Sequence, residues 1–104
     1  MTRVVVSARA NDDLAEILQY LTAEAGPRVA RDYRERFRTF YRLVGDHPDI
    51  GPARSRLGQG IRIGVVDPYL AIYRRDRDGV TVLRIVHGRR RITGAMLKPR
   101  ETKR

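Results

Sequence analysis

The sequence contains no cysteine and no tryptophan, and its 104 residues include only two histidines, His47 and His87. Without cysteine the chain has no disulfides, no thiolate metal ligands and no cysteine nucleophile. A zinc site would need carboxylates to complete its ligand set. We therefore expect the protein to bind no metal and no other cofactor.

Long hydrophobic runs are also missing. No apolar stretch approaches the roughly 20 residues that a membrane-spanning helix requires. Met1 to Val6 contains one charged side chain and one short apolar run, and no signal-peptide pattern follows it. A chain of this length is near the common size for a single hydrophobic core. We expect one soluble domain that acts in the cytoplasm and has no membrane partner.

Charge is abundant and is distributed unevenly. The chain has 22 Lys and Arg residues against 12 Asp and Glu residues, a net charge of +10. Eight of the basic residues and one acid, Glu101, lie between Arg84 and Arg104, so this end carries +7. The remaining 83 residues carry only +3. Such asymmetry favours a polyanionic or acidic partner.

Apolar residues at helical spacing predict a first helix, and the positions i, i+3, i+4 and i+7 are Leu14, Ile17, Leu18 and Leu21. Ser7 and Asn11 are both candidates for its N-cap. Asp12 and Asp13 are expected in its first turn, where carboxylates complement the helix dipole.

A second amphipathic helix should follow at once. Gly26 is expected to end the first helix, and Pro27 suits the first turn of the next one. This helix should stop by His47, because Pro48 disfavours helical geometry in the residue before it. The apolar face of this helix holds Val29, Tyr33, Phe37, Phe40, Tyr41 and Val44.

Four short strands are predicted around these helices. Three valines mark the first, at residues 3–7, and Pro and Gly residues mark a loop from Pro48 to Gly60. The other strands are Ile61–Val66, Tyr69–Arg75 and Val80–His87. Both faces of the last three strands carry apolar residues. One face of the sheet should therefore be covered and the other partly covered.

Turn signals separate the last three strands. Asp67-Pro68 is the first turn, and Asp78-Gly79 predicts a two-residue hairpin. Tyr69 and Tyr73 alternate with apolar residues, so we expect both rings on one face, packed in the core.

The order strand, helix, helix, strand, strand, strand predicts an α+β fold. A two-helix hairpin would pack on one face of a three-stranded antiparallel meander. Residues 1–92 should form this single domain, followed by a basic C-terminal tail at residues 93–104.

Several segments occur in the order and spacing of a known family. They are the opening strand with Ser7, then Asp13-Leu14, Ile17, Tyr20-Leu21, Leu43, His47–Gly51, Arg62, Tyr69–Arg74 and Val82–Arg90. From about Val4 to Ile92 the chain resembles the ParE/RelE superfamily of bacterial type II toxins. The RelE-like branch comprises ribosome-dependent messenger-RNA endonucleases, and the ParE-like branch is associated with inhibition of DNA gyrase.

The run Arg-Ile-Val-His-Gly-Arg-Arg, residues 84–90, looks more like the ParE branch. The resemblance implies a toxin that arrests growth by binding DNA gyrase. It also implies neutralisation by a cognate antitoxin, expected to be acidic and partly disordered, with its own DNA-binding part. A RelE-like endonuclease acting on the ribosome is the alternative, and a direct DNA-binding module is a third, less favoured class.

For the nuclease alternative, RNA cleavage without metal needs an acid–base pair and cations for the phosphate. His87 is the candidate near neutral pKa, with Arg62 and Arg84 as phosphate ligands. The competing interpretation makes His87 a strand-end residue bonded to a neighbouring loop. In that interpretation Arg84 forms a salt bridge with Asp67 or Asp76.

Two surfaces are predicted for partners. The antitoxin would lay a helix or strand along the helical seam and the sheet edge. Candidate contacts there are Leu14, Leu18, Phe37 and Tyr41, with the alternative that all four are simply core. The target, DNA gyrase, would meet the basic end of the chain, through Arg89, Arg90, Arg91, Lys98 and Arg100.

Overall fold

The computed structural model describes residues 2–98. Strand β1 (Val4–Val6) leads into helices α1 (Ala8–Ala25) and α2 (Pro27–Asp46), followed by strands β2 (Ile61–Val66), β3 (Tyr69–Asp76) and β4 (Gly79–His87). The strands form one sheet in the order β1-β4-β3-β2, in which only β1 pairs in parallel. The predicted α+β architecture is confirmed. None of the helices in the described residues is long and apolar enough to cross a membrane.

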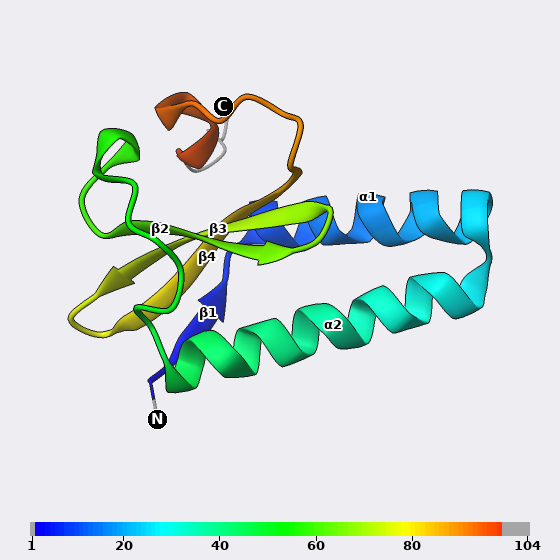
Figure 1. The fold of residues 1–104 in the computed structure, drawn as a ribbon, viewed down its shortest axis with the longest axis horizontal. Helices are drawn as coiled ribbons and strands as arrows, with labels where there is room; N and C mark the ends of the chain where they lie inside the picture. The colour runs from blue at the N-terminus through cyan, green and yellow to red at the C-terminus, as the bar shows by residue number, and fades with distance from the viewer. Residues whose placement is uncertain (1, 99–104) are drawn as a thin grey trace, which may run out of the picture.

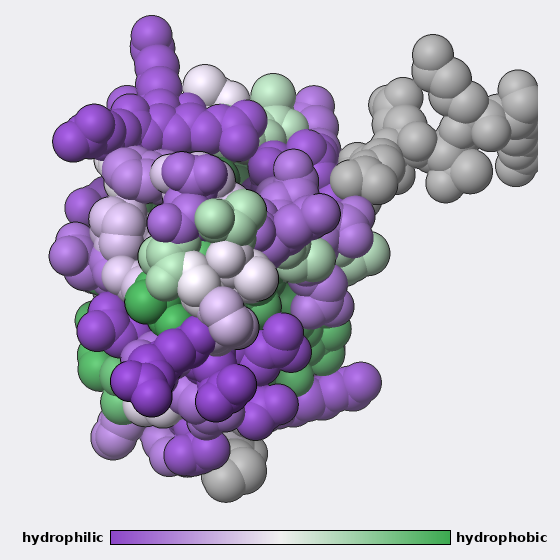
Figure 2. All heavy atoms as spheres, turned by 90° about the vertical axis from the view of Figure 1, so that its right-hand side faces the viewer, coloured by the Kyte–Doolittle hydropathy of each residue, from purple (hydrophilic) through white to green (hydrophobic). Residues whose placement is uncertain are grey.

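The two helices form a hairpin whose closed end extends beyond the sheet (Figure 1). Gly26 makes this tight turn with a φ of +97°, and its N–H donates to the Thr22 carbonyl at 3.1 Å. Pro27 then begins α2, where its missing N–H costs nothing. The predicted helix junction is therefore confirmed. At the closed end the surface is mostly hydrophilic, with hydrophobic side chains gathered near its centre (Figure 2).

Ser7 caps α1. Its hydroxyl oxygen accepts the N–H of Ala10 at 3.0 Å, so the helix begins at Ala8. The alternative cap, Asn11, lies inside the helix, and Asp12 and Asp13 fall in its second turn. The expectation that these acids occupy the first turn was wrong, because the helix starts one turn earlier than the acidic pair suggested.

The β3–β4 hairpin turns one residue earlier than predicted. Asp76 pairs with Gly79, so the two loop residues are Arg77 and Asp78. The Asp76 carboxylate accepts the N–H groups of Asp78 and Gly79 at 2.9 and 3.0 Å and closes the turn. Gly79 opens β4 with a φ of +147°, and a Cβ there would lie 2.3 Å from the Arg3 carbonyl oxygen. The glycine is therefore needed by the strand start rather than by the loop.

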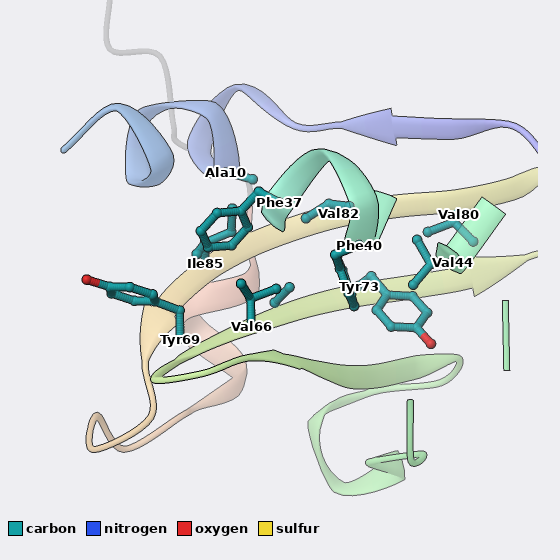
Figure 3. Packing of buried hydrophobic residues seen from close by; sticks show 11 residues of the cluster. Ala10, Phe37, Phe40, Val44, Val66, Tyr69, Tyr73, Val80, Val82 and Ile85 are labelled. Carbon is teal, nitrogen blue, oxygen red and sulfur yellow. The ribbon is translucent and has the colours of Figure 1, made fainter. Parts of the chain in front are cut away.

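A core layer lies on each face of the sheet. The larger one, between the helices and the sheet, is built around Phe37, Phe40, Val44, Tyr73 and Val82 (Figure 3). The smaller one contains Ile61, Ile63, Ile72, Val86 and Leu97. Tyr69 and Tyr73 both belong to the larger core, as predicted. Partial cover of the second face is also confirmed.

The smaller core is closed by segments without regular strands. The 3-10 helices η1 (Ser55–Leu57) and η2 (Gly94–Leu97) lie beside it and contribute Leu57, Met96 and Leu97. In Figure 1 the C-terminal segment lies across the sheet from α2. The first part of the expected basic tail is thus packed against the sheet, and residues 99–104 lie outside the described residues.

Candidate functional site

A β-bulge in β4 determines where Arg84 points. Tyr73 pairs with Val82 and Ile72 pairs with Arg84, so Leu83 has no partner in the register. The extra residue breaks the strand's alternation. Val82 therefore faces the larger core, while Arg84 lies on the side of Ile72 and the smaller core.

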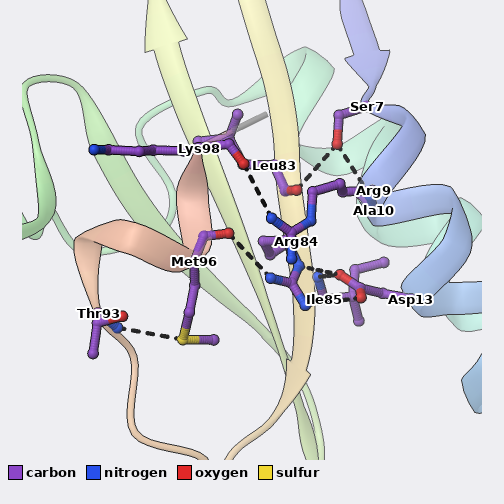
Figure 4. A network of polar contacts seen from close by, with 10 residues as sticks. All are labelled: Ser7, Arg9, Ala10, Asp13, Leu83, Arg84, Ile85, Thr93, Met96 and Lys98. Atoms are coloured by element: carbon purple, nitrogen blue, oxygen red, sulfur yellow. Dashed lines mark hydrogen bonds and ion pairs between the residues drawn. The ribbon is translucent and has the colours of Figure 1, made fainter. Parts of the chain in front are cut away.

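Arg84 forms a bidentate ion pair with Asp13 of α1 (Figure 4). Its Nε and Nη2 donate to the two carboxylate oxygens at 2.7 and 3.1 Å. The backbone N–H of Ile85 donates to the same carboxylate at 2.9 Å, and Arg84 Nη1 donates to the Met96 carbonyl at 3.1 Å. Arg84 is only 5% exposed.

The expectation that Arg84 pairs with Asp67 or Asp76 was wrong. Strand β1 covers β4 only as far as Val82, which leaves the following backbone edge open. The carboxylate of Asp13 accepts the N–H of Ile85 at that edge, and the bulge directs the Arg84 guanidinium toward the same carboxylate. A charge pair so well hydrogen-bonded and buried is a structural anchor that also holds the C-terminal segment through Met96.

Arg62 performs a different structural task at the other side of the sheet. Its Nη1 donates to the carbonyls of Asp49 and Gly51 at 3.1 and 2.7 Å, and its Nε lies 3.4 Å from the Asp49 carboxylate. The Tyr73 hydroxyl donates to the Pro48 carbonyl at 2.8 Å and accepts the Gly51 N–H at 3.0 Å. Together they hold the loop that leaves α2.

His87 is exposed at the end of β4. Its Nδ1 accepts the N–H of Arg89 at 3.1 Å, and its ring lies edge-on to Tyr69 with the centroids 5.8 Å apart. These contacts confirm the interpretation of His87 as a strand-end residue bonded to its neighbouring loop.

The three residues of the nuclease alternative do not converge. Arg62 opposes Tyr73 and Arg84 opposes Ile72, whose side chains belong to the two different cores, so the arginines lie on opposite faces of the sheet. His87 lies at the other end of β3, opposite Tyr69. Within residues 2–98, no group of three His, Asp or Glu side chains could hold a metal ion.

The four candidate antitoxin contacts lie in or against the core. Phe37 has no exposed surface, and Leu18 is 9% exposed. Leu14 and Tyr41 are partly buried against the larger core. Leu18 also lines a groove of about 550 Å³ between the helices, together with Ala15, Gln19, Thr22, Pro27, Ala30, Arg31 and Arg34.

Tyr41 has an unusual environment for a polar group. Its hydroxyl is buried and has no hydrogen-bond partner among the residues that the structure describes. Burial raises the pKa of Tyr41 to about 12. The protonated hydroxyl therefore contributes no hydrogen bond to stability. Its burial disfavours the charged tyrosinate form.

The candidate target contacts are exposed. Arg89, Arg90 and Arg91 follow β4 directly, and none of them forms an ion pair with an acid in the described part of the chain. Lys98 is exposed as well, and its carbonyl accepts Arg9 Nη1 at 3.2 Å. Arg100 lies outside the described residues.

A basic groove joins two of these arginines to two others that the sequence did not single out. Arg54 and Arg56, from the loop before β2, line it together with Arg90 and Arg91. Its volume is about 350 Å³, and its apolar lining includes Leu57, Ile63, Val65, Leu70 and Ile92. We call it the arginine groove. In the sequence, the only sign of this groove is the pair Arg54 and Arg56 in the loop. Their position opposite the end of β4 depends on the fold.

A family model described as the ParE toxin of type II toxin–antitoxin system, parDE, matches residues 4–92. The chain belongs to the ParE toxin family. Toxin ParE3 of Caulobacter vibrioides is 28% identical to it over 98 residues, which cover 94% of this chain and 98% of that protein.

The fold has a solved counterpart. A structure described as the chromosomal ParDE TA system from P. aeruginosa matches with a TM-score of 0.71 and 20% sequence identity, over 84% of this chain and 96% of that chain. At this identity the match supports the fold alone. The family model and the similarity to Toxin ParE3 confirm the ParE branch of the superfamily, which the sequence favoured.

Proposed function

We propose that this ParE family toxin arrests bacterial growth in the cytoplasm by binding DNA gyrase, and that a cognate antitoxin holds it inactive. Membership in a family of type II toxin–antitoxin proteins supports the general role. The observation that carries the proposed target contact is the exposed cluster Arg89–Arg91 at the end of β4. These unpaired cations can meet an acidic surface at no cost in broken ion pairs.

The antitoxin is proposed to lay an amphipathic helix in the groove between α1 and α2. This groove combines the exposed Ala15 and Pro27 and the edge of Leu18 with the charges of Arg31 and Arg34. An acidic amphipathic helix matches both features. Leu18→Ala should weaken the complex several-fold while circular dichroism shows an intact fold; unchanged affinity would remove this contact from the proposal.

The experiment for the target is a pulse-label time course after induction of the toxin alone, following DNA and protein synthesis in one culture. DNA synthesis should fall first. If protein synthesis falls first, the ribosome becomes the target and the gyrase proposal fails.

A charge-neutralising variant tests the contact itself. Replacing Arg89, Arg90 and Arg91 by Gln should lower gyrase affinity roughly tenfold, the sum of three modest rim interactions. The control replaces three other exposed arginines, Arg28, Arg42 and Arg77, and removes the same charge. Equal losses in both variants would refute a specific contact. Substitution is preferred to truncation from residue 93, because truncation would also remove Leu97 from the smaller core.

A further inference from the structure

Backbone hydrogen bonds fix both sides of the arginine groove to the sheet. On one side, the Arg54 N–H donates to the Ile61 carbonyl at 2.8 Å. On the other side, the Gly88 N–H donates to the Pro68 carbonyl at 2.8 Å, directly before Arg90 and its neighbour. The two pairs of arginines are therefore held on segments of defined position, facing a common groove.

The four arginines of the groove have no acidic partner among residues 2–98. All four side chains are exposed, and none of them forms an ion pair in this range. Arg54 Nη1 donates to the carbonyl of the neighbouring Ala53 at 3.0 Å. Because a guanidinium has five N–H donors, most donors of the groove remain available to a ligand.

The groove lining contains donors but no side-chain acceptor. Every polar side chain in the lining is an arginine, and the other lining residues are glycine, proline, leucine, isoleucine and valine. A matching ligand must bring acceptor oxygens and negative charge at several positions, with apolar groups between them. Guanidinium groups are suited to the bidentate recognition of phosphate oxygens.

We propose that the arginine groove binds the sugar-phosphate backbone of DNA. This backbone presents acceptor oxygens and no hydrogen-bond donors, and its sugar CH groups can lie on the aliphatic floor of Leu57, Leu70 and Ile92. Contacts to phosphate and sugar carry no sequence information, so binding should be independent of base sequence. DNA gyrase acts on DNA, and the groove would hold the DNA of the toxin–gyrase complex. This last assignment rests on the proposed function.

Other polyanions match the lining less well. An acidic peptide brings a backbone N–H at nearly every residue, and RNA brings a 2′-hydroxyl donor at every nucleotide. The lining offers no side-chain acceptor for either kind of donor. A strand of DNA needs only donors from the protein, and its phosphates recur about every 3.4 Å along the helix axis, which suits cations on both sides of a groove.

The groove divides the basic surface of the toxin between two partners. Arg90 and Arg91 belong both to the groove and to the cluster proposed to contact gyrase, whereas Arg89 is not in the lining. Arg54 and Arg56 belong to the groove alone. The toxin should therefore bind gyrase more tightly when gyrase holds DNA, and Arg54 and Arg56 should account for the difference.

Fluorescence anisotropy of a short labelled DNA duplex, titrated with the full-length toxin at several salt concentrations, tests the groove directly. Four phosphate contacts predict a slope of about −3.6 when the logarithm of the binding constant is plotted against that of the salt concentration. Arg54→Gln combined with Arg56→Gln should reduce this slope by about 1.8 and weaken binding roughly tenfold. A duplex of different base sequence should bind equally well.

The control combines Arg28→Gln with Arg77→Gln, which removes the same charge from exposed positions outside the groove. It should leave the slope nearly unchanged, because the slope counts phosphate contacts rather than total charge. Circular dichroism checks that both variants are folded. Equal losses in the two folded variants would overturn the site, and tighter binding of an RNA duplex of the same sequence would overturn the choice of DNA.

A second titration compares DNA-free gyrase with gyrase that holds a DNA duplex. Wild-type toxin should bind the DNA-containing complex several-fold more tightly. The variant at Arg54 and Arg56 should lose this gain, and the control at Arg28 and Arg77 should keep it. Such a pattern supports the DNA contact within the complex.

The outcomes separate this inference from the proposed function. If wild-type toxin binds gyrase equally well with and without DNA, the DNA contact is refuted and the gyrase proposal stands. If it binds neither form, the gyrase proposal fails together with the assignment of the DNA to gyrase, and the duplex titration alone decides the groove. If it binds gyrase but no duplex, and the variant at Arg54 and Arg56 weakens binding to DNA-free gyrase, the groove contacts an acidic protein surface and the inference is overturned.

Discussion

Replacing Asp13 by alanine should destabilise the protein more than almost any other change at a polar side chain. The substitution leaves the Arg84 guanidinium, whose side chain is 6% exposed, with one remaining bond, to the Met96 carbonyl. It also leaves the backbone N–H of Ile85 without its acceptor. The substitution therefore leaves a buried charge without its counter-ion and a buried N–H without its acceptor.

The expected loss follows from these two terms. Removing one partner of a buried ion pair costs about 3–5 kcal/mol, because the other charge remains without compensation. A domain of this size has a free energy of unfolding of about 5–15 kcal/mol, so the variant should lose a large fraction of its stability. A double variant, Asp13→Leu with Arg84→Met, removes both charges and should recover most of the loss.

Urea unfolding followed by circular dichroism measures these differences. The design compares wild type, Asp13→Ala, Arg84→Met and the double variant as a thermodynamic cycle. As an exposed control, Glu35→Ala breaks the surface pair with Arg38 and should cost no more than about 0.5 kcal/mol. A loss below about 1 kcal/mol for Asp13→Ala, or additive single losses in the double variant, would refute the assignment of Asp13–Arg84 as the anchor.

Three further outcomes are expected from single substitutions. Gly64→Ala should cost about 1–3 kcal/mol in urea unfolding, because its Cβ would lie 2.2 Å from Phe40 Cε1. Tyr41→Phe should be neutral or stabilising by up to about 1 kcal/mol at pH 7, since the lost hydroxyl has no partner. Because the folded pKa of Tyr41, about 12, exceeds the unfolded value of 10, wild-type stability should fall as pH rises from 10 through 12. The part due to this half-buried residue, about 1–2 kcal/mol after screening, should be absent from Tyr41→Phe in unfolding curves at pH 9 and 11.5. His87→Ala should leave growth arrest unchanged wherever the variant is folded, since His87 bonds only to its own loop; a loss of arrest with intact folding would restore the nuclease alternative.

The elements of the fold were predictable from the sequence because their signals are local. Helical spacing, Gly26-Pro27 and Pro48 define the hairpin, and Asp67-Pro68 separates two strands whose apolar residues alternate. The errors lie where two local signals competed. Ser7 and Asn11 could both cap α1, and the Asp78-Gly79 signal pointed one residue past the turn that the Asp76 carboxylate closes. In each case the backbone hydrogen bonds of the folded protein decide, and they depend on neighbouring segments.

The environment of Arg84 could not be predicted, because it depends on the bulge at Leu83. Strict alternation would place Val82 and Arg84 on the same face. The bulge separates them and brings Arg84 within reach of Asp13, a residue 71 positions earlier in the chain. A contact over such a distance leaves no periodic trace in the sequence.

The same bulge limits where function can lie. Arg84 is the basic residue nearest the middle of the sheet, and it is fully engaged with Asp13 and Met96. The cations left for a partner are those at the rim, at the end of β4 and in the loop before β2. These exposed arginines remain available to an anionic partner surface such as those proposed above.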